Sequence, residues 1–190
     1  TCTLSGVFLT HAHMGHYTGL MHLGREAMNT HDVPVWAMPR MTGFLMSNGP
    51  WSQLVDLRNI ELHAMQADSV VKLSDSLNVT PFVVPHRDEF SETVGFRIAS
   101  TRGQVVFVPD IDKWERWDRR IETLVAHVRT AYVDGTFFDA NELPGRDMSK
   151  IPHPFIAETI ARLASLPVEA RARIHFIHLN HTNRAASAGS

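Results

Sequence analysis

The stretch Thr10-His11-Ala12-His13-Met14-Gly15-His16 carries three histidines within six residues, directly after the apolar run Gly6-Val7-Phe8-Leu9. The apolar run predicts a short strand, and the following residues predict a tight turn in which Gly15 lets the backbone bend. Imidazoles on such a turn can converge on one point, as a divalent metal ion requires. A histidine-rich surface turn without a ligand is the alternative interpretation.

The composition is that of an ordinary globular protein. The 190 residues, 44% hydrophobic and 20% charged, predict one domain over residues 1–184 and a loose tail over residues 185–190. A net charge of −2 without any Lys/Arg block argues against a nucleic-acid partner. No apolar run approaches the roughly 18 residues of a membrane span, and the N-terminal residues lack the pattern of a signal peptide.

Cysteine and histidine usage point to a reducing compartment and to histidine as a metal ligand. Cys2 is the only cysteine, which rules out an intrachain disulfide and fits a cytoplasmic protein. Cysteine therefore cannot build a metal site in this chain, whereas twelve histidines can supply one.

Strand and helix patterns alternate along the chain. Apolar runs predict strands at 33–38, 60–64, 70–73, 77–84, 93–99, 104–108, 130–133 and 173–179, with those at 60–64 and 70–73 antiparallel. Helical spacing predicts helices at 17–28, 39–49, 51–57 and 117–128, and a final helix with Ile156, Ile160, Leu163 and Ala164 on its core face. These elements predict an α/β fold, but periodicity alone does not choose its layering.

Further metal-ligand candidates follow apolar strands. His86 follows the strand predicted at 77–84, Asp110 follows the strand at 104–108, and His178 lies at the end of the strand at 173–179. Asp112 competes with Asp110, but its position three residues before Glu115 suits a helix cap better. His181 is as well explained by a surface position as by one lining a pocket.

The histidine turn resembles the HxHxDH signature of the metallo-β-lactamase superfamily, with Gly15 where that family usually has aspartate. The resemblance recurs in order at His86, Asp110 and His178 and spans about residues 8–183. It implies an αββα sandwich. The strands that the family has before its first motif and after its last ligand have no counterpart here, so we expect either a fragment or a homo-oligomer that completes the sheets.

The same resemblance implies a set of metal ligands. One ion would take His11, His13 and His86, and a second would take His16 and His178, with Asp110 shared between them. Imidazole and carboxylate ligands suit zinc, and also iron or manganese. Because Gly15 removes one carboxylate, we expect one firmly held ion and a second that binds more weakly or not at all.

The implied chemistry is hydrolysis of a phosphodiester or another small ester by a metal-bound hydroxide, since a bound metal lowers the pKa of water to roughly 7. In tRNase Z and phosphodiesterase relatives, an acidic residue before a Thr-Phe pair and a later histidine lie beside the metals; Asp134 and His153 look similar. A strand-end turn at Asp134 and an imperfect helix cap at His153 are the structural alternatives.

Two other functions remain open. Residues 134–137 and 180–183 resemble the pyrroloquinoline quinone biosynthesis protein B branch of the superfamily, which implies an iron-dependent oxygenase. A non-catalytic metal-binding remnant is the third hypothesis, because of Gly15 and the absent strands. In each enzymatic case we expect a small-molecule substrate, and we expect no nucleic-acid or membrane partner.

Overall fold

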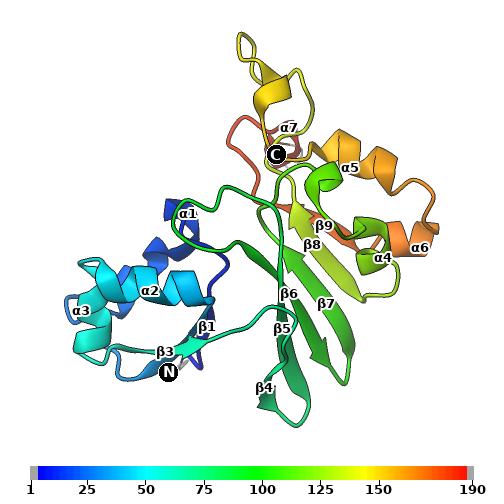
Figure 1. Cartoon of the computed structure of the whole chain (residues 1–190). Coiled ribbons are helices and arrows are strands. Elements are labelled where there is room, and N and C mark those ends of the chain that lie inside the picture. The colour runs from blue at the N-terminus through cyan, green and yellow to red at the C-terminus, as the bar shows by residue number, and fades with distance from the viewer. Residues whose placement is uncertain (1–3, 188–190) are drawn as a thin grey trace. The chain divides into compact units, whose positions relative to one another are not determined.

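The computed structural model describes residues 4–187. They form two compact units, one of residues 4–69 and 87–94 and the other of residues 70–86 and 95–187, and each unit has its own sheet (Figure 1). The single domain over residues 1–184 and the tail after it stay predictions. Residues 184–187 of this region form helix α7 (Arg184–Ser187), and Cys2 lies outside the described residues.

The first unit contains a three-stranded parallel sheet in the order β1 (Val7–Phe8), β2 (Val33–Ala37) and β3 (Ile60–Ala64). Helices α2 (Pro39–Ser47) and α3 (Trp51–Asp56) form the long connection that parallel neighbours such as β2 and β3 require. The prediction that residues 60–64 form an antiparallel strand is therefore wrong. Alternation shows which side chains are buried, but it does not identify the partner strand.

Helices cover one face of this sheet and form the first core with it. The core is built from alternate residues of the strands and from the inner faces of the helices. Its buried members are Leu9, Ala12, Tyr17, Leu20, Leu23, Val33, Val35, Ala37, Met41, Leu45, Leu54 and Ile60.

The first helical segment is shorter than predicted. It consists of α1 (Met14–Tyr17) and the 3₁₀ helix η1 (Thr18–Leu23), whereas the spacing predicted a helix up to Met28. Gly24 has an extended backbone, and its carbonyl accepts hydrogen bonds from two later amides in a turn. Met28 is 60% exposed, so its apolar character does not reflect a place in the core.

The second unit contains a six-stranded sheet in the order β4-β5-β6-β7-β8-β9. Its strands are β4 (Val71–Ser74), β5 (Leu77–Val83), β6 (Val94–Ser100), β7 (Gly103–Val108), β8 (Thr130–Asp134) and β9 (Ile174–Ile177). Strand β4 pairs antiparallel with β5, as does β6 with β7, while β7, β8 and β9 are mutually parallel. Because parallel strands end at the same edge of a sheet, the residues that follow β7, β8 and β9 lie close together.

Short helices pack on this sheet and enclose the second core. They are η2 (Trp114–Arg116), α4 (Ile121–Val125), α5 (Ile156–Arg162) and α6 (Val168–Arg171). The buried cluster includes Phe82, Val106, Ile111, Trp114, Ile121, Val133 and Leu163. Met148 of η3 (Met148–Lys150) belongs instead to a separate small cluster with Phe137, Ile151 and Phe155. The helix predicted over residues 117–128 is helical only in α4, and Ile160, predicted to face the core from α5, is 52% exposed.

Thr159 takes the buried position on α5 that the pattern assigned to Ile160. Its hydroxyl accepts a hydrogen bond from the Trp114 indole nitrogen at 2.8 Å, and both side chains are buried. We expect Thr159→Val to lower the free energy of unfolding by about 1–3 kcal/mol, because the indole N–H then lies buried without its acceptor. Urea denaturation measures this. The exposed Thr123→Val on α4 is the matched control, and an equal effect of both substitutions would contradict the prediction.

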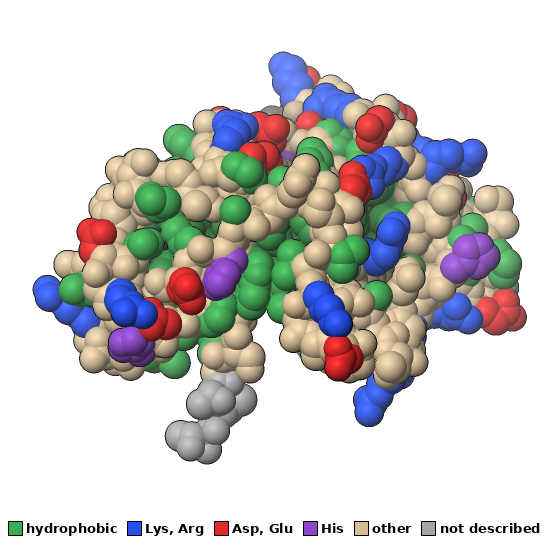
Figure 2. Space-filling model, turned by 60° about the horizontal axis from the view of Figure 1, so that its bottom comes forward, with side chains coloured by type: hydrophobic (Ala, Val, Ile, Leu, Met, Phe, Trp, Pro, Cys, Tyr) green, Lys and Arg blue, Asp and Glu red, His purple; other side chains and the backbone are tan. Residues whose placement is uncertain are grey.

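Charged side chains do not form a field of a single sign on the face that Figure 2 shows, where Lys and Arg lie among Asp and Glu. Within residues 4–187, no helix combines the length and the apolar character needed to cross a bilayer.

Candidate metal centre

Backbone groups of the histidine turn in the first unit form hydrogen bonds with the segment of residues 87–94. The Ala12 amide donates to the Ser91 hydroxyl at 2.8 Å, and the Val94 amide donates to the Thr10 carbonyl at 3.1 Å. Ser91 is only 2% exposed, so water does not compete for its hydroxyl. The backbone on both sides of His11 is thereby fixed.

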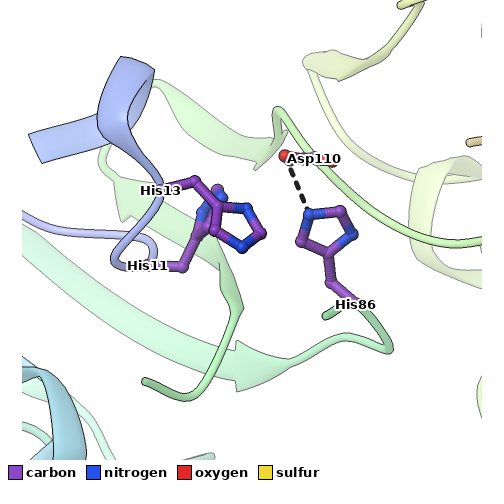
Figure 3. A group of neighbouring side chains, drawn as sticks. All are labelled: His11, His13, His86 and Asp110. Carbon is purple, nitrogen blue, oxygen red and sulfur yellow. Dashed lines mark ion pairs between the residues drawn. The ribbon is translucent and has the colours of Figure 1, made fainter. Parts of the chain in front are cut away.

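The three histidines of the turn lie close together, as the sequence predicted. The ring centroid of His11 is 4.6 Å from that of His13 and 4.1 Å from that of His16, and Figure 3 shows the first two side by side on the turn. The Nε2 atom of His13 lies 3.0 Å from a carboxylate oxygen of Glu89. This hydrogen bond lowers the pKa of the Glu89 carboxyl below its ordinary value.

Gly15 does not have the role that the sequence suggested. It lies within helix α1, its φ is not among the positive glycine values, and a Cβ atom added to it would meet nothing within 4 Å. The turn therefore does not require glycine for its bend. A larger side chain can be placed at this position without a clash.

His86 and Asp110 form a buried ion pair in the second unit, drawn as a dashed line in Figure 3. The Nε2 atom of His86 lies 3.1 Å from an oxygen of Asp110, and the Nδ1 atom lies 3.1 Å from an oxygen of Asp112. Burial alone would lower the pKa of His86, but its hydrogen bond to Asp110, the negative charge of Asp110 and its hydrogen bond to Asp112 raise it overall. The predicted helix-cap role of Asp112 is wrong, since the residue before η2 is Lys113 and no side chain caps that helix.

Asp134, the last residue of β8, is completely buried and accepts several hydrogen bonds. Its donors include the Thr136 amide at 2.8 Å, the Thr136 hydroxyl at 2.6 Å and the Ile111 amide at 3.2 Å. Burial raises the pKa of this carboxyl, but the hydrogen bond from His153 and the nearby imidazole of His178 lower it by more, so the net shift is downward. Asp134 is therefore ionised at neutral pH.

Asp110, Asp134, His153 and His178 form one cluster, and it lies entirely within the second unit. One ligand atom from each of the four lies within 4.8 Å of the others. His178 reaches the cluster from a backbone with φ of 62°, in the left-handed region that few residues other than glycine adopt. Two carboxylates and two imidazoles are a donor set that suits zinc, iron or manganese, so the residues fit a divalent metal.

His153 joins the two carboxylates of this cluster. Its Nδ1 atom lies 2.8 Å from Asp134 and 3.2 Å from Asp110. Burial opposes its protonation, but the hydrogen bonds that it donates to the two carboxylates, together with their negative charge, raise the pKa of His153 to about 10.

We therefore expect His153 of the metal-free protein to stay protonated at pH 8. A group with a raised pKa contributes its full stabilisation below its ordinary pKa of 6.5 and loses it as pH rises toward about 10. NMR titration of the imidazole Cε1 proton measures this, with Asp134→Asn as the comparison, because that substitution removes one of the two neighbouring charges. Titration of His153 near pH 6.5 in the wild-type protein would contradict the prediction.

The structure groups the predicted site residues as follows. His11, His13 and His16 lie together in the first unit, while His86 and the four-residue cluster lie in the second. The ligand and catalytic roles of these residues stay predictions. Thr136, to which the sequence analysis gave no role of its own, also contacts the cluster, since its hydroxyl lies 2.9 Å from Nδ1 of His178. The available signal was its place in the Thr-Phe pair two residues after Asp134.

The fold is mixed α/β, and histidines and carboxylates that could hold a metal ion cluster at the ends of its parallel strands. The sequence profile described as "Beta-lactamase superfamily domain" matches residues 2–178, and the chain therefore belongs to the metallo-β-lactamase superfamily. No match was found among curated proteins.

Solved structures with the same fold include three that resemble this chain over nearly its whole length. Zn²⁺-bound PqqB from Methylobacterium extorquens has a TM-score of 0.76 at 18% identity, with 97% of this chain and 66% of that chain covered. Unliganded yeast PDE1 has a TM-score of 0.63 at 15% identity, with 92% and 57% covered. The short form of human tRNase Z has a TM-score of 0.61 at 14% identity, with 93% and 73% covered. This chain thus spans less than two thirds of the first two.

Proposed function

We propose that this protein is a metal-dependent hydrolase that acts on a phosphodiester or another small ester. The observation that carries the proposal is the cluster of Asp110, Asp134, His153 and His178, whose ligand atoms lie within 4.8 Å of one another at the carboxyl edge of the parallel strands. Two carboxylates and two imidazoles gathered in this way are a donor set that could hold a divalent metal ion.

The family motif supplies the ligand assignment of this proposal. His11, His13 and His86 would hold one ion and His16 and His178 a second, with Asp110 shared. The ion would be zinc, with iron or manganese as alternatives. When bound, it supplies a water of lowered pKa and polarises the carbonyl or phosphoryl oxygen of the substrate.

In this proposal, Asp134 and His153 protonate the leaving group of the substrate. The Asp134 carboxylate accepts from Nδ1 of His153 at 2.8 Å, which fixes the orientation of the ring. The Nε2 edge of His153 then donates a proton to the leaving-group oxygen of the substrate. Thr136, bonded to both Asp134 and His178, keeps these side chains in place.

The known proteins of this fold support a phosphate ester as the substrate. Human tRNase Z, a diphosphatase of the PhnP family and yeast PDE1 all share this fold. The mixed charges in Figure 2 favour a small molecule over a nucleic acid. A cytoplasmic location, the lack of a membrane partner and a homo-oligomeric state belong to the same proposal. No β-lactam substrate follows from the name of the fold, because function resides in the site.

An iron-dependent oxygenase of cofactor biosynthesis is the second candidate. The TM-score of 0.76 to PqqB over 97% of this chain favours it, together with the resemblance of residues 134–137 to that branch. Iron in freshly purified protein and oxygen consumption with a peptide substrate would support the oxygenase. A colourless zinc protein that hydrolyses esters would support the hydrolase.

A panel of activated phosphodiesters and carboxylic esters tests the proposed hydrolase, assayed after loading with zinc, manganese or iron. We expect turnover of at least one substrate that is abolished in His86→Ala. That result would exclude a non-catalytic remnant. Metal-loaded protein that leaves the whole panel intact would contradict the proposal.

Gly15→Asp tests the assignment of the second ion. A carboxylate at this open position, next to His16, restores the ligand that the family motif has. We expect the second ion to bind about tenfold more tightly or better, a gain of about 1.4 kcal/mol or more. Isothermal titration with zinc measures it, and Gly15→Ala controls for the change in helix propensity. Equal second-site affinity in both variants would contradict the assignment.

A further inference from the structure

Asp112 lies two residues after Asp110, and both of its carboxylate oxygens are engaged. One oxygen is 3.1 Å from Nδ1 of His86, and the other is 2.8 Å from a guanidinium nitrogen of Arg116. The Asp112 amide also donates to the Pro85 carbonyl at 2.7 Å. Backbone and side chain of Asp112 thus both bond to the two-residue segment of Pro85 and His86.

We infer that Asp112 is a positioning residue for His86: it accepts the Nδ1 proton, fixes the ring, and leaves Nε2 directed at Asp110 as the metal-binding atom. Figure 3 shows the ring of His86 with one nitrogen toward Asp110, and this Nε2–oxygen distance is 3.1 Å. A histidine has two distinct nitrogens, and the hydrogen bond made by one decides which is available to a metal. The inference rests on the proposed function, since it concerns a metal ligand.

Other roles explain the contacts of Asp112 less well. Its side chain is 12% exposed, so it is not a solvated loop carboxylate, and it does not cap η2. Its ion pair with Arg116, whose side chain is 60% exposed, is of the kind that adds little stability. The His86 side chain is completely buried, so its Nδ1 has no water as an alternative acceptor. Arg116 instead serves to hold the carboxylate in the orientation that His86 needs.

Zinc affinity of the full chain tests the inference, measured by competition with a chromophoric chelator. We expect Asp112→Ala to bind zinc about 10–100-fold more weakly, as for other residues that orient a metal-ligating histidine. Asp112→Asn should lose less, because its amide oxygen still accepts from Nδ1. Asp118→Ala, which removes an exposed carboxylate of the same segment, should bind zinc like the wild type.

The conservative variant separates positioning from a purely structural effect. An amide oxygen at position 112 still accepts from Nδ1 of His86, so Asp112→Asn should recover part of the zinc affinity that Asp112→Ala loses. If Asp112→Ala does not fold, Asp112→Asn and Arg116→Ala keep the test open, with affinity losses of a few-fold expected for each. Wild-type zinc affinity in all of the Asp112 and Arg116 variants, while His86→Ala loses affinity, would overturn the inference and leave the proposed function standing. A wild-type protein that binds no zinc, manganese or iron would overturn both.

Discussion

Replacing Asp110 by asparagine is expected to weaken zinc binding by more than about 100-fold, beyond the range found for residues that only orient ligands. Asp110 is 4% exposed and lies 3.1 Å from His86 and 3.2 Å from His153. It is therefore the carboxylate that these two histidines share. An amide of the same shape preserves the packing but removes that charge. Hydrolysis should fall with metal content, and elemental analysis of dialysed protein measures the loss.

Asp139→Asn provides the control for this change. Asp139 also follows β8, but its carboxylate pairs with Arg184 at 3.0 Å instead of with a histidine of the cluster. It should bind zinc and hydrolyse substrate like the wild type. Asp110→Asn protein that retains a full complement of zinc would show that Asp110 is not a ligand.

Replacing His153 by alanine is expected to reduce hydrolysis by about 10²–10⁴-fold while the metal is retained, because a proton donor is lost and the predicted ligands are not. The essential result is that hydrolysis falls while the metal content does not. His153 belongs to the same cluster as Asp110 and His178, so a role as a ligand is the competing interpretation. Metal content and activity must therefore be measured on the same sample.

Substrates with different leaving groups sharpen this test. A donor to the leaving group matters less when that group departs easily, so His153→Ala should lose less activity on nitrophenyl esters than on alkyl esters. The wild type and His153→Gln are the comparisons. Loss of metal from His153→Ala would contradict the catalytic assignment and place His153 among the ligands.

The sequence predicted the parts of this protein that depend on local patterns. Apolar strands followed by histidine or aspartate are visible in one dimension, which is why β5, β7, β8 and β9 were found close to their observed bounds. The cluster of Asp110, Asp134, His153 and His178 joins residues that the family resemblance named, and the parallel order of β7, β8 and β9 explains their proximity.

Strand pairing and side-chain contacts between residues far apart in the sequence could not be predicted from local patterns. The parallel pairing of β3 with β2 depends on the helices between them and not on the alternation of β3. Asp112 has the sequence signature of a helix cap, yet its carboxylate forms a hydrogen bond with the buried imidazole of His86. The two residues are 26 positions apart. Ser91 and Glu89 hold the histidine turn from more than 70 residues away, and no local pattern marks them.

Anomalous scattering at the zinc edge, from crystals of the full chain loaded with zinc, tests the metal centre most directly. We expect a strong peak within bonding distance of Asp110 and of Nε2 of His86, and a weaker second peak near His178. Crystals that contain zinc but show no peak beside Asp110, or show it only at surface histidines, would contradict this expectation.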